Sequence, residues 1–204
     1  MAGFFLVLEG PEGAGKTTLA AALAARARAV GGPVVSVREP GGTPVAEAAR
    51  AIVLDPAHEV PAESEVLLML AARADLVRRV IRPSLDAGSL VIADRFDLST
   101  RAYQVAGRGL PEALVASANR LATGGLEPDL TLVLDLSPEE GRARQLAAGK
   151  ARDRMEAEDL AFHSRVAASY LAAHGEGIQH LNAAIPADRL LEDAWLALSA
   201  KWRT

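Results

Sequence analysis

The stretch Phe4–Leu23, FFLVLEGPEGAGKTTLAAAL, has an apolar run directly before a glycine-rich turn and an alanine- and leucine-rich stretch directly after it. Gly10, Gly15, Lys16 and Thr17 match the pattern G-x-x-x-x-G-K-[ST], and a strand before it with a helix after it is the context in which this pattern binds phosphate. Small residues let successive backbone N–H groups surround an anion, and the helix N-terminus adds partial positive charge. The stretch therefore predicts a phosphate-binding loop that opens an α/β domain.

The lysine and threonine of this loop indicate which anion it binds. Lys16 is placed to reach the β- and γ-phosphates of a nucleoside triphosphate, and the Thr17 hydroxyl is a predicted Mg²⁺ ligand. An ordinary glycine-rich turn between a strand and a helix is the alternative, but it would not require this spacing together with the lysine.

Short apolar runs alternate with longer helical patterns along the rest of the chain. The predicted strands after the first cover 33–39, 89–95, 129–136 and 177–182, and the clearest helical patterns cover 16–30 and 63–85. Continuous apolar runs are typical of strands that are covered on both faces. We therefore expect residues 1–204 to form a single α/β domain of the P-loop NTPase fold, a five-stranded parallel sheet with helices on both faces.

The composition excludes several classes of function. The 204 residues carry a formal net charge of −4 and include no cysteine, which excludes disulfides, thiolate catalysis and cysteine-bound metals. We find no signal-peptide pattern at the start and no apolar run of membrane length. The expectation is a cytoplasmic protein that has neither nucleic acid nor a membrane as its partner.

Two further regions look like parts of an acceptor site. Asp94 and Arg95 follow a predicted strand, at the edge where open α/β sheets bind ligands. Asp94 is a candidate Mg²⁺ ligand, and Arg95 is a candidate bridge between donor and acceptor phosphates. A surface ion pair between the two residues would give the same sequence pattern. Arg73 lies within an apolar helical stripe, so its guanidinium either needs a buried partner or extends to water.

The segment 141–158 is dense in charge, and its apolar pattern fades. Its cations are Arg142, Arg144, Lys150, Arg152 and Arg154. A solvated face is the usual reading of such a run. Because phosphoryl transfer between two phosphates must overcome anion repulsion, we interpret the segment as a mobile lid that supplies a second cation beside Lys16.

Taken in order, these motifs resemble those of bacterial thymidylate kinases. The resemblance covers about Phe4 to Tyr170 and rests on GPEGAGKTT, REPGGTP, EVLLMLAAR, DRFDLSTRAYQ, GRG and PDLTLVLDLSPEEG. It implies Mg²⁺-dependent phosphorylation of dTMP to dTDP by ATP, for dTTP synthesis, in a homodimeric P-loop kinase.

The resemblance also assigns residues. It implies that ATP is bound by Gly10, Pro11, Glu12, Gly13, Ala14, Gly15, Lys16, Thr17 and Thr18. It implies that dTMP is bound by Glu12, Glu39, Arg50, Met69, Arg73, Arg95, Thr100, Tyr103 and Gln104, with Arg73, Thr100 and Gln104 on the thymine side. The catalytic residues would be Lys16, Asp94, Arg95 and the lid residue Arg152, with Mg²⁺ at Thr17 and Asp94. A cis bond between Glu39 and Pro40 is implied in the same way.

Two positions depart from the family pattern. Met69 stands where relatives have a phenylalanine that stacks on thymine, and a thioether packs on a ring less rigidly. Gly13 stands where some members carry an arginine, so this chain resembles the kind that supplies its extra cation from the lid.

Three alternatives remain at this point. A deoxynucleoside kinase would need a carboxylate base at the acceptor hydroxyl, a role open to Glu12, Glu39 or Asp97. A kinase acting on dUMP is the second alternative. Its substrate lacks only the methyl group of thymine, and a pocket can discriminate one such group by about 1–3 kcal/mol of binding free energy. A non-catalytic nucleotide-binding module would bind ATP without turnover.

Overall fold

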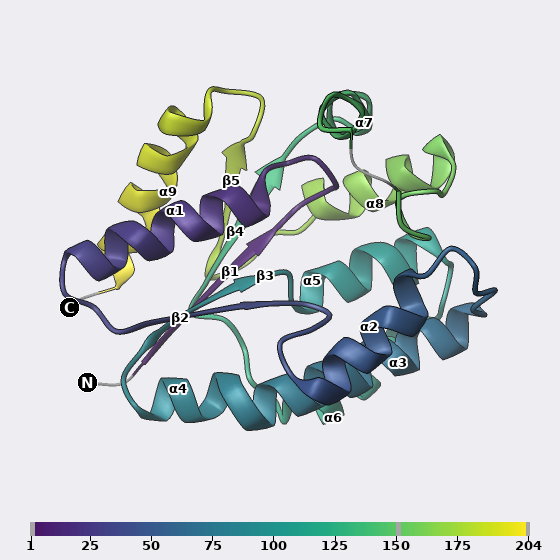
Figure 1. The fold of residues 1–204 in the computed structure, drawn as a ribbon, viewed down its shortest axis with the longest axis horizontal. Helices are drawn as coiled ribbons and strands as arrows, with labels where there is room; N and C mark the ends of the chain where they lie inside the picture. The colour runs from purple at the N-terminus through teal and green to yellow at the C-terminus, as the bar shows by residue number, and fades with distance from the viewer. Residues whose placement is uncertain (1–2, 150–151, 203–204) are drawn as a thin grey trace.

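The computed structural model describes residues 3–149 and 152–202, and they form one sheet with helices on both faces (Figure 1). All strand pairs are parallel, in the order β2-β3-β1-β4-β5. The strands are β1 (Phe4–Glu9), β2 (Val34–Arg38), β3 (Leu90–Asp94), β4 (Leu130–Asp135) and β5 (Ile178–Asn182). Each lies within a predicted strand, so the predicted fold class is confirmed.

The helices alternate with these strands. They are α1 (Lys16–Ala29), α2 (Pro44–Leu54), α3 (Ala62–Leu76), α4 (Arg82–Asp86), α5 (Asp97–Thr100), α6 (Glu112–Thr123), α7 (Pro138–Ala147), α8 (Leu160–Leu171) and α9 (Ala187–Lys201). Among the described residues, no helix combines the length and apolar character that a membrane crossing requires.

Alternate side chains of the strands enter two different cores. Leu6 and Leu8 of β1 pack with α1 and α9 on one face of the sheet. Phe5 and Val7 point to the other face, where the end of α3 and the segment that follows it cover the sheet. Figure 1 shows α1 and α9 together on one side and the continuous α3–α4 rod on the other. Burial on both faces explains why these strands read as unbroken apolar runs.

The predicted helix over 63–85 is continuous in space but changes its winding. A π-helical segment, η1 (Val77–Ile81), joins α3 to α4, and a second, η2 (Arg101–Gly107), follows α5. Pro83 lies in the first turn of α4 and has no N–H for the helical ladder, which accounts for wider winding just before it. The periodicity of the apolar residues did not predict either segment.

The first half of the predicted lid segment is largely helical. Helix α7 includes residues 141–147, so the dense charge there lies on a mostly exposed helix. Its role as a mobile lid stays a prediction. The Ser137 hydroxyl accepts a hydrogen bond from the Glu140 N–H at 3.2 Å and caps the helix, with two glutamates in its first turn. Lys150 lies outside the described residues.

Candidate functional site

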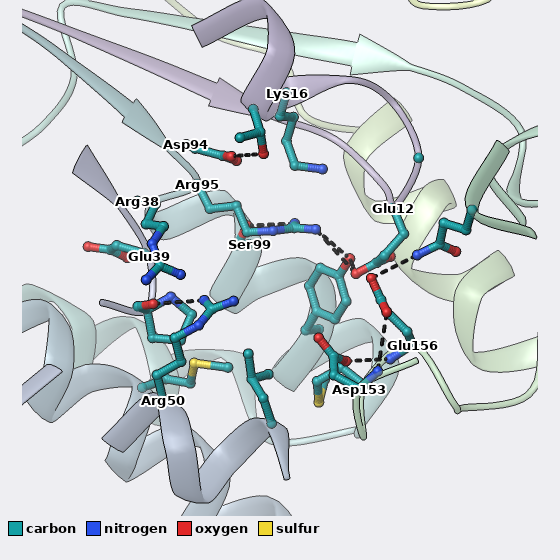
Figure 2. Close-up of a pocket in the computed structure, with 18 of the residues that line it drawn as sticks. Glu12, Lys16, Arg38, Glu39, Arg50, Asp94, Arg95, Ser99, Asp153 and Glu156 are labelled. Atoms are coloured by element: carbon teal, nitrogen blue, oxygen red, sulfur yellow. Dashed lines mark hydrogen bonds and ion pairs between the residues drawn. The ribbon is translucent and has the colours of Figure 1, made fainter. Parts of the chain in front are cut away.

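A cavity of about 520 Å³ lies at the carboxyl ends of β1, β2 and β3 (Figure 2). The register brings the ends of these strands together, since Leu8 and Arg38 both pair with Asp94. Most of the predicted site residues line this one cavity: Glu12, Gly13, Gly15, Lys16, Thr17, Thr18, Glu39, Arg50, Met69, Arg73, Asp94, Arg95, Thr100, Tyr103 and Gln104.

The side chain of Lys16 folds back onto the backbone of the phosphate-binding loop. Lys16 Nζ donates to the carbonyl oxygens of Gly10 at 2.9 Å and Pro11 at 2.7 Å, and the side chain is buried. Burial, reinforced by the positive charge of Arg95, lowers the pKa of Lys16 to about 8. Gly10, Pro11 and the buried Ala14 form the backbone of the loop behind the cavity lining. The ammonium group must leave these carbonyls to contact a phosphate.

Thr17 and Asp94 come together beside the lysine. The Thr17 hydroxyl donates to Asp94 Oδ2 at 2.5 Å, from the first turn of α1 to the end of β3. Oxygen donors of this kind suit Mg²⁺, which keeps most of its other positions for water and substrate phosphates. No cluster of three or more acidic, histidine or cysteine side chains suited to a metal occurs within residues 3–149 and 152–202. The pair therefore fits a cation that is held largely by its substrate.

Arg95 occupies the centre of the cavity in a strained backbone conformation. Its φ of 76° is the one positive value among the described non-glycine residues. One terminal nitrogen donates to the Gly10 carbonyl, the Ser99 hydroxyl and the Tyr170 hydroxyl at 3.1–3.2 Å. The other lies 3.2 Å from Glu12 Oε1, and the guanidinium packs 5.1 Å from the Tyr103 ring centre. In this conformation one guanidinium contacts the phosphate-binding loop at Gly10 and Glu12 and also reaches α5 and α8.

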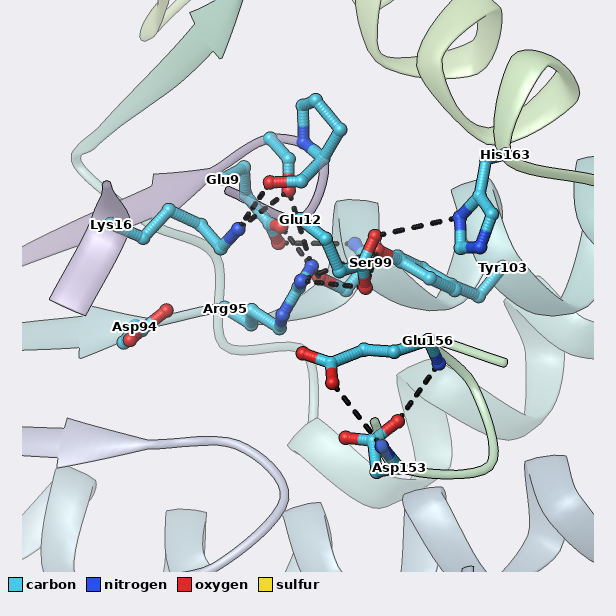
Figure 3. A network of polar contacts seen from close by, with 12 residues as sticks. Glu9, Glu12, Lys16, Asp94, Arg95, Ser99, Tyr103, Asp153, Glu156 and His163 are labelled. Atoms are coloured by element: carbon cyan, nitrogen blue, oxygen red, sulfur yellow. Dashed lines mark hydrogen bonds and ion pairs between the residues drawn. The ribbon is translucent and has the colours of Figure 1, made fainter. Parts of the chain in front are cut away.

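Glu12 of the loop faces this arginine and not the solvent (Figure 3). The Tyr103 hydroxyl donates to Glu12 Oε1, and His163 Nδ1 lies 3.8 Å from Oε2. Burial raises the pKa of Glu12, but the charges of Arg95 and Lys16 together with the tyrosine outweigh it, so its net pKa lies below the usual value. Glu12 is thus an ionised carboxylate in the cavity wall.

Arg73 has a buried partner, so the alternative in which its head extends to water is wrong. Its side chain is 4% exposed, and it pairs with Glu39 at 2.6 Å. Its other donors contact the Thr100 hydroxyl at 2.8 Å, the Asn119 side-chain oxygen at 2.6 Å and the Phe96 carbonyl at 2.8 Å. The Glu39–Pro40 bond is cis, as the resemblance implied.

The remaining predicted acceptor residues lie around this pair. Met69 lines the cavity one helical turn before Arg73, and Arg50 donates to the Pro40 carbonyl at 2.9 Å. Gln104 is buried, and its amide nitrogen donates to Glu65 Oε1 at 2.9 Å. The predicted thymine-side residues therefore share one wall of the cavity.

The lid cations separate into different places. Arg144 of α7 lines the large cavity and donates to the Gly13 carbonyl at 3.3 Å and the Ala183 carbonyl at 2.8 Å. Arg142 and Arg152, the predicted catalytic cation, line a smaller pocket beside Pro11 instead. Arg154 is engaged with Glu65 at 2.5 Å. Charge alone could not distinguish these positions.

Several residues of the site could not be identified from sequence patterns. Glu9 is completely buried at the end of β1 and accepts hydrogen bonds from the Phe96 and Ser99 N–H groups and from the Ser99 and Tyr170 hydroxyls. The sequence signal for Glu9 is an acidic residue at the end of an apolar strand. Further residues that line the cavity are Arg38, Ser99, Gln145, Asp153, Met155 and Glu156.

The chain is similar to known proteins over nearly its whole length. A family model described as thymidylate kinase matches residues 8–193. A thymidylate kinase of Deinococcus radiodurans is 48% identical over 202 residues, which cover 98% of both chains. A thymidylate kinase of Thermomicrobium roseum is 45% identical over 199 residues, covering 96% of this chain and 94% of the relative. One from Pseudomonas fluorescens is 51% identical over 173 residues, covering 84% and 82%.

Proposed function

Because this chain belongs to the thymidylate kinase family, we propose that its cavity binds ATP and dTMP together and transfers the γ-phosphoryl group to dTMP. The products are ADP and dTDP, a precursor of dTTP. The observation that carries the proposal is the shared cavity. Lys16 and Thr17 line its donor part, and Met69 and Arg73 line its acceptor part. Arg95 points into the space between Lys16 and Arg50 (Figure 2).

The acceptor in this reaction is a phosphate oxygen, which needs no strong base. The second pKa of a phosphomonoester is about 6, so the attacking oxygen is mostly ionised at neutral pH. It forms a bond to the γ-phosphorus while the bond from that phosphorus to the β-phosphate oxygen breaks. Lys16 and Arg95 offset the repulsion between the two anions and align them, which is the main source of rate in such transfers.

The residues also fit the magnesium ion that the family uses. Thr17 and Asp94 would hold it, directly or through water, next to the donor phosphates. The ion supplies charge neutralisation on the transferring group when bound. The hydrogen bond that Thr17 donates to Asp94 holds these two oxygen donors next to each other.

A protein cation from the lid segment, beside Lys16 and Arg95, is part of the proposal. The position of Arg144 in the cavity lining supports it as the lid cation that contacts the donor phosphates. Arg152, which the sequence analysis placed among the catalytic residues, lines the smaller pocket, and its catalytic role stays a prediction.

A homodimer and a cytoplasmic location belong to the proposal as well. The dimer is supported by large exposed leucines on the neighbouring helices α3 and α6: Leu67 is 63% exposed, Leu114 69% and Leu121 86%. Sedimentation of the protein at micromolar concentration tests the dimer, because a lone 21.3 kDa species would contradict it. The location stays a prediction.

The test of the function is ADP production with ATP and Mg²⁺ across dTMP, dUMP, dCMP, dAMP, dGMP and thymidine. We expect turnover with dTMP. Turnover with thymidine and not dTMP would instead indicate a deoxynucleoside kinase, and nucleotide binding without any turnover would indicate a non-catalytic module.

A broader pyrimidine monophosphate kinase is the second candidate. Met69 lines the cavity where relatives stack a phenylalanine, and selectivity for the thymine methyl group is worth only about 1–3 kcal/mol. Equal rates with dTMP and dUMP would favour this candidate without changing the roles of Lys16 and Arg95.

A further inference from the structure

Glu65 lies behind the acceptor wall and takes no part in the mechanism described above. Its side chain is completely buried in α3, and it accepts hydrogen bonds from three side chains. Gln104 Nε2 donates to Oε1 at 2.9 Å, Arg108 donates to both oxygens at 3.0–3.2 Å, and Arg154 donates to Oε2 at 2.5 Å. This carboxylate therefore joins α3, the η2 region and the second half of the lid segment, which carries Arg154.

The charge of Glu65 determines how the Gln104 amide is oriented. Burial raises the pKa of Glu65, but the hydrogen bonds from Arg108, Gln104 and Arg154 outweigh it, so the net pKa lies below the usual value. An ionised carboxylate can only accept hydrogen bonds, so Gln104 must turn its NH₂ group toward it. The carbonyl oxygen of the amide is then directed elsewhere. No N–H or O–H group in the described ranges donates to that oxygen, and Gln104 lines the cavity.

We propose that Glu65 is a positioning residue that sets base selectivity, because it locks Gln104 with an acceptor oxygen presented to the base. The inference rests on the proposed function. Thymine and uracil carry an N–H at ring position 3, which this oxygen can accept. Cytosine has an acceptor nitrogen at this position. Its lone pair would face the lone pairs of the Gln104 oxygen with no hydrogen between them, a mismatch that costs binding free energy in a buried site.

The neighbouring arginine is less free to make this distinction. Each nitrogen of the Arg73 guanidinium already donates to a protein acceptor, namely Glu39, Thr100, Asn119 or the Phe96 carbonyl. Turning the Gln104 amide over would place its oxygen against the Glu65 carboxylate and lose a charge-assisted hydrogen bond. The orientation is therefore fixed by Glu65 before any base binds.

The test compares the binding of dTMP with that of 5-methyl-dCMP, which has the same shape and the opposite hydrogen-bonding edge. Calorimetric titrations use the wild-type protein, Glu65→Gln and Glu158→Gln. We expect wild type to prefer dTMP by about 100-fold. In Glu65→Gln the neutral amide lets Gln104 turn over, so this preference falls by about tenfold. Glu158 is the matched control, since it accepts from the same Arg108 at 2.6 Å without contacting Gln104, and its variant keeps the wild-type ratio.

An unchanged ratio in Glu65→Gln, or a wild-type protein with no preference between the two nucleotides, overturns the inference. If Glu65→Gln does not fold, Gln104→Met tests the same oxygen with Glu65 in place: dTMP affinity falls and 5-methyl-dCMP affinity does not. Equal changes for both nucleotides overturn the role of the oxygen. ADP production by wild type with dTMP tests the proposed function separately, so turnover with an unchanged ratio defeats only the role of Glu65.

Discussion

Gly13 of the phosphate-binding loop and Gly141 of α7 lie backbone against backbone. A Cβ atom added to Gly13 would lie 2.4 Å from the Gly141 carbonyl oxygen, and one added to Gly141 would lie 2.3 Å from the Glu12 carbonyl oxygen. Neither contact can relax by turning a side chain. The helix that carries Arg144 thus packs directly on the loop that is proposed to bind the donor phosphates.

Gly141→Ala should push α7 off this loop. Alanine favours helix by about 1 kcal/mol over glycine, so any loss of stability comes from the clash, which we expect to cost about 1–3 kcal/mol. KM for ATP should rise more than KM for dTMP. Ala143→Gly, on an exposed position of the same helix, is the control: it lowers helix propensity and should leave both KM values unchanged. A Gly141→Ala protein with wild-type stability and KM would mean that the loop and helix move apart freely.

Lys16→Ala should remove most of the phosphoryl transfer, with a fall in kcat of about 10²–10³ as for other groups that stabilise transition-state charge. In the wild-type protein the pKa of Lys16 is lowered to about 8 by burial and by Arg95. The free enzyme therefore loses this charge as the pH rises through about 8, and ATP affinity should fall above that pH. Titrating ATP binding between pH 7 and 9 in both proteins checks this, and a pH dependence that persists in Lys16→Ala would assign it to another group.

Arg95→Ala should reduce kcat and raise KM for dTMP together, because the guanidinium lies between the two halves of the cavity. We expect a loss of about 10²-fold or more in kcat/KM. Arg101→Ala is a suitable control, since Arg101 is exposed and pairs only with Glu112 among the described residues. Steady-state kinetics with varied dTMP concentration would measure the effects on kcat and on KM separately. Unchanged values of both constants would show that Arg95 takes no part in the reaction.

Met69→Phe should tighten dTMP binding, because a flat ring stacks on a base more rigidly than a thioether does. A gain of about 0.5–1.5 kcal/mol corresponds to a roughly two- to tenfold lower Kd. Calorimetry with dTMP measures it. Weaker binding in the variant would show that the base does not lie over this position.

His180 should make stability depend on pH. Burial lowers the pKa of His180, but the Ala173 carbonyl at 2.7 Å and the Asp135 carboxylate at 2.9 Å outweigh it, so the net pKa is raised. The contribution of His180 to stability is fully present below its unfolded-state pKa, near 6.5. It is lost as the pH rises through the higher pKa of the folded state. Denaturant unfolding at pH 5.5 and 8.5 should show a smaller pH effect in His180→Gln than in wild type. An equal pH effect in the two proteins would show that His180 is not the responsible group.

The fold could be predicted from local patterns, and the site only in part. The strands β1, β3 and β4 are evident as apolar runs, whereas β5, with Gln179, His180 and Asn182, is only weakly marked. The spacing from Gly10 to Thr17 predicts the first turn. The partners of Arg73 and the seat of α7 on Gly13 depend on contacts between segments far apart in the chain, which no local pattern encodes. The lid cations look alike in sequence, and their different roles follow from which carbonyl or carboxylate each one meets.

The contacts that complete the cavity have a consequence for how the chain folds. Arg95 contacts the Gly10 carbonyl 85 positions away, and the Tyr170 hydroxyl contacts Glu9 across 161 positions. Contacts between residues so distant in the chain carry a large loop-closure cost and form slowly. A chain that has made only its helices still lacks the contacts of the arginine and the tyrosine that complete the site. Recovery of nucleotide binding during refolding should therefore lag behind recovery of helical signal, which makes the bound nucleotide a reporter of the last step of assembly.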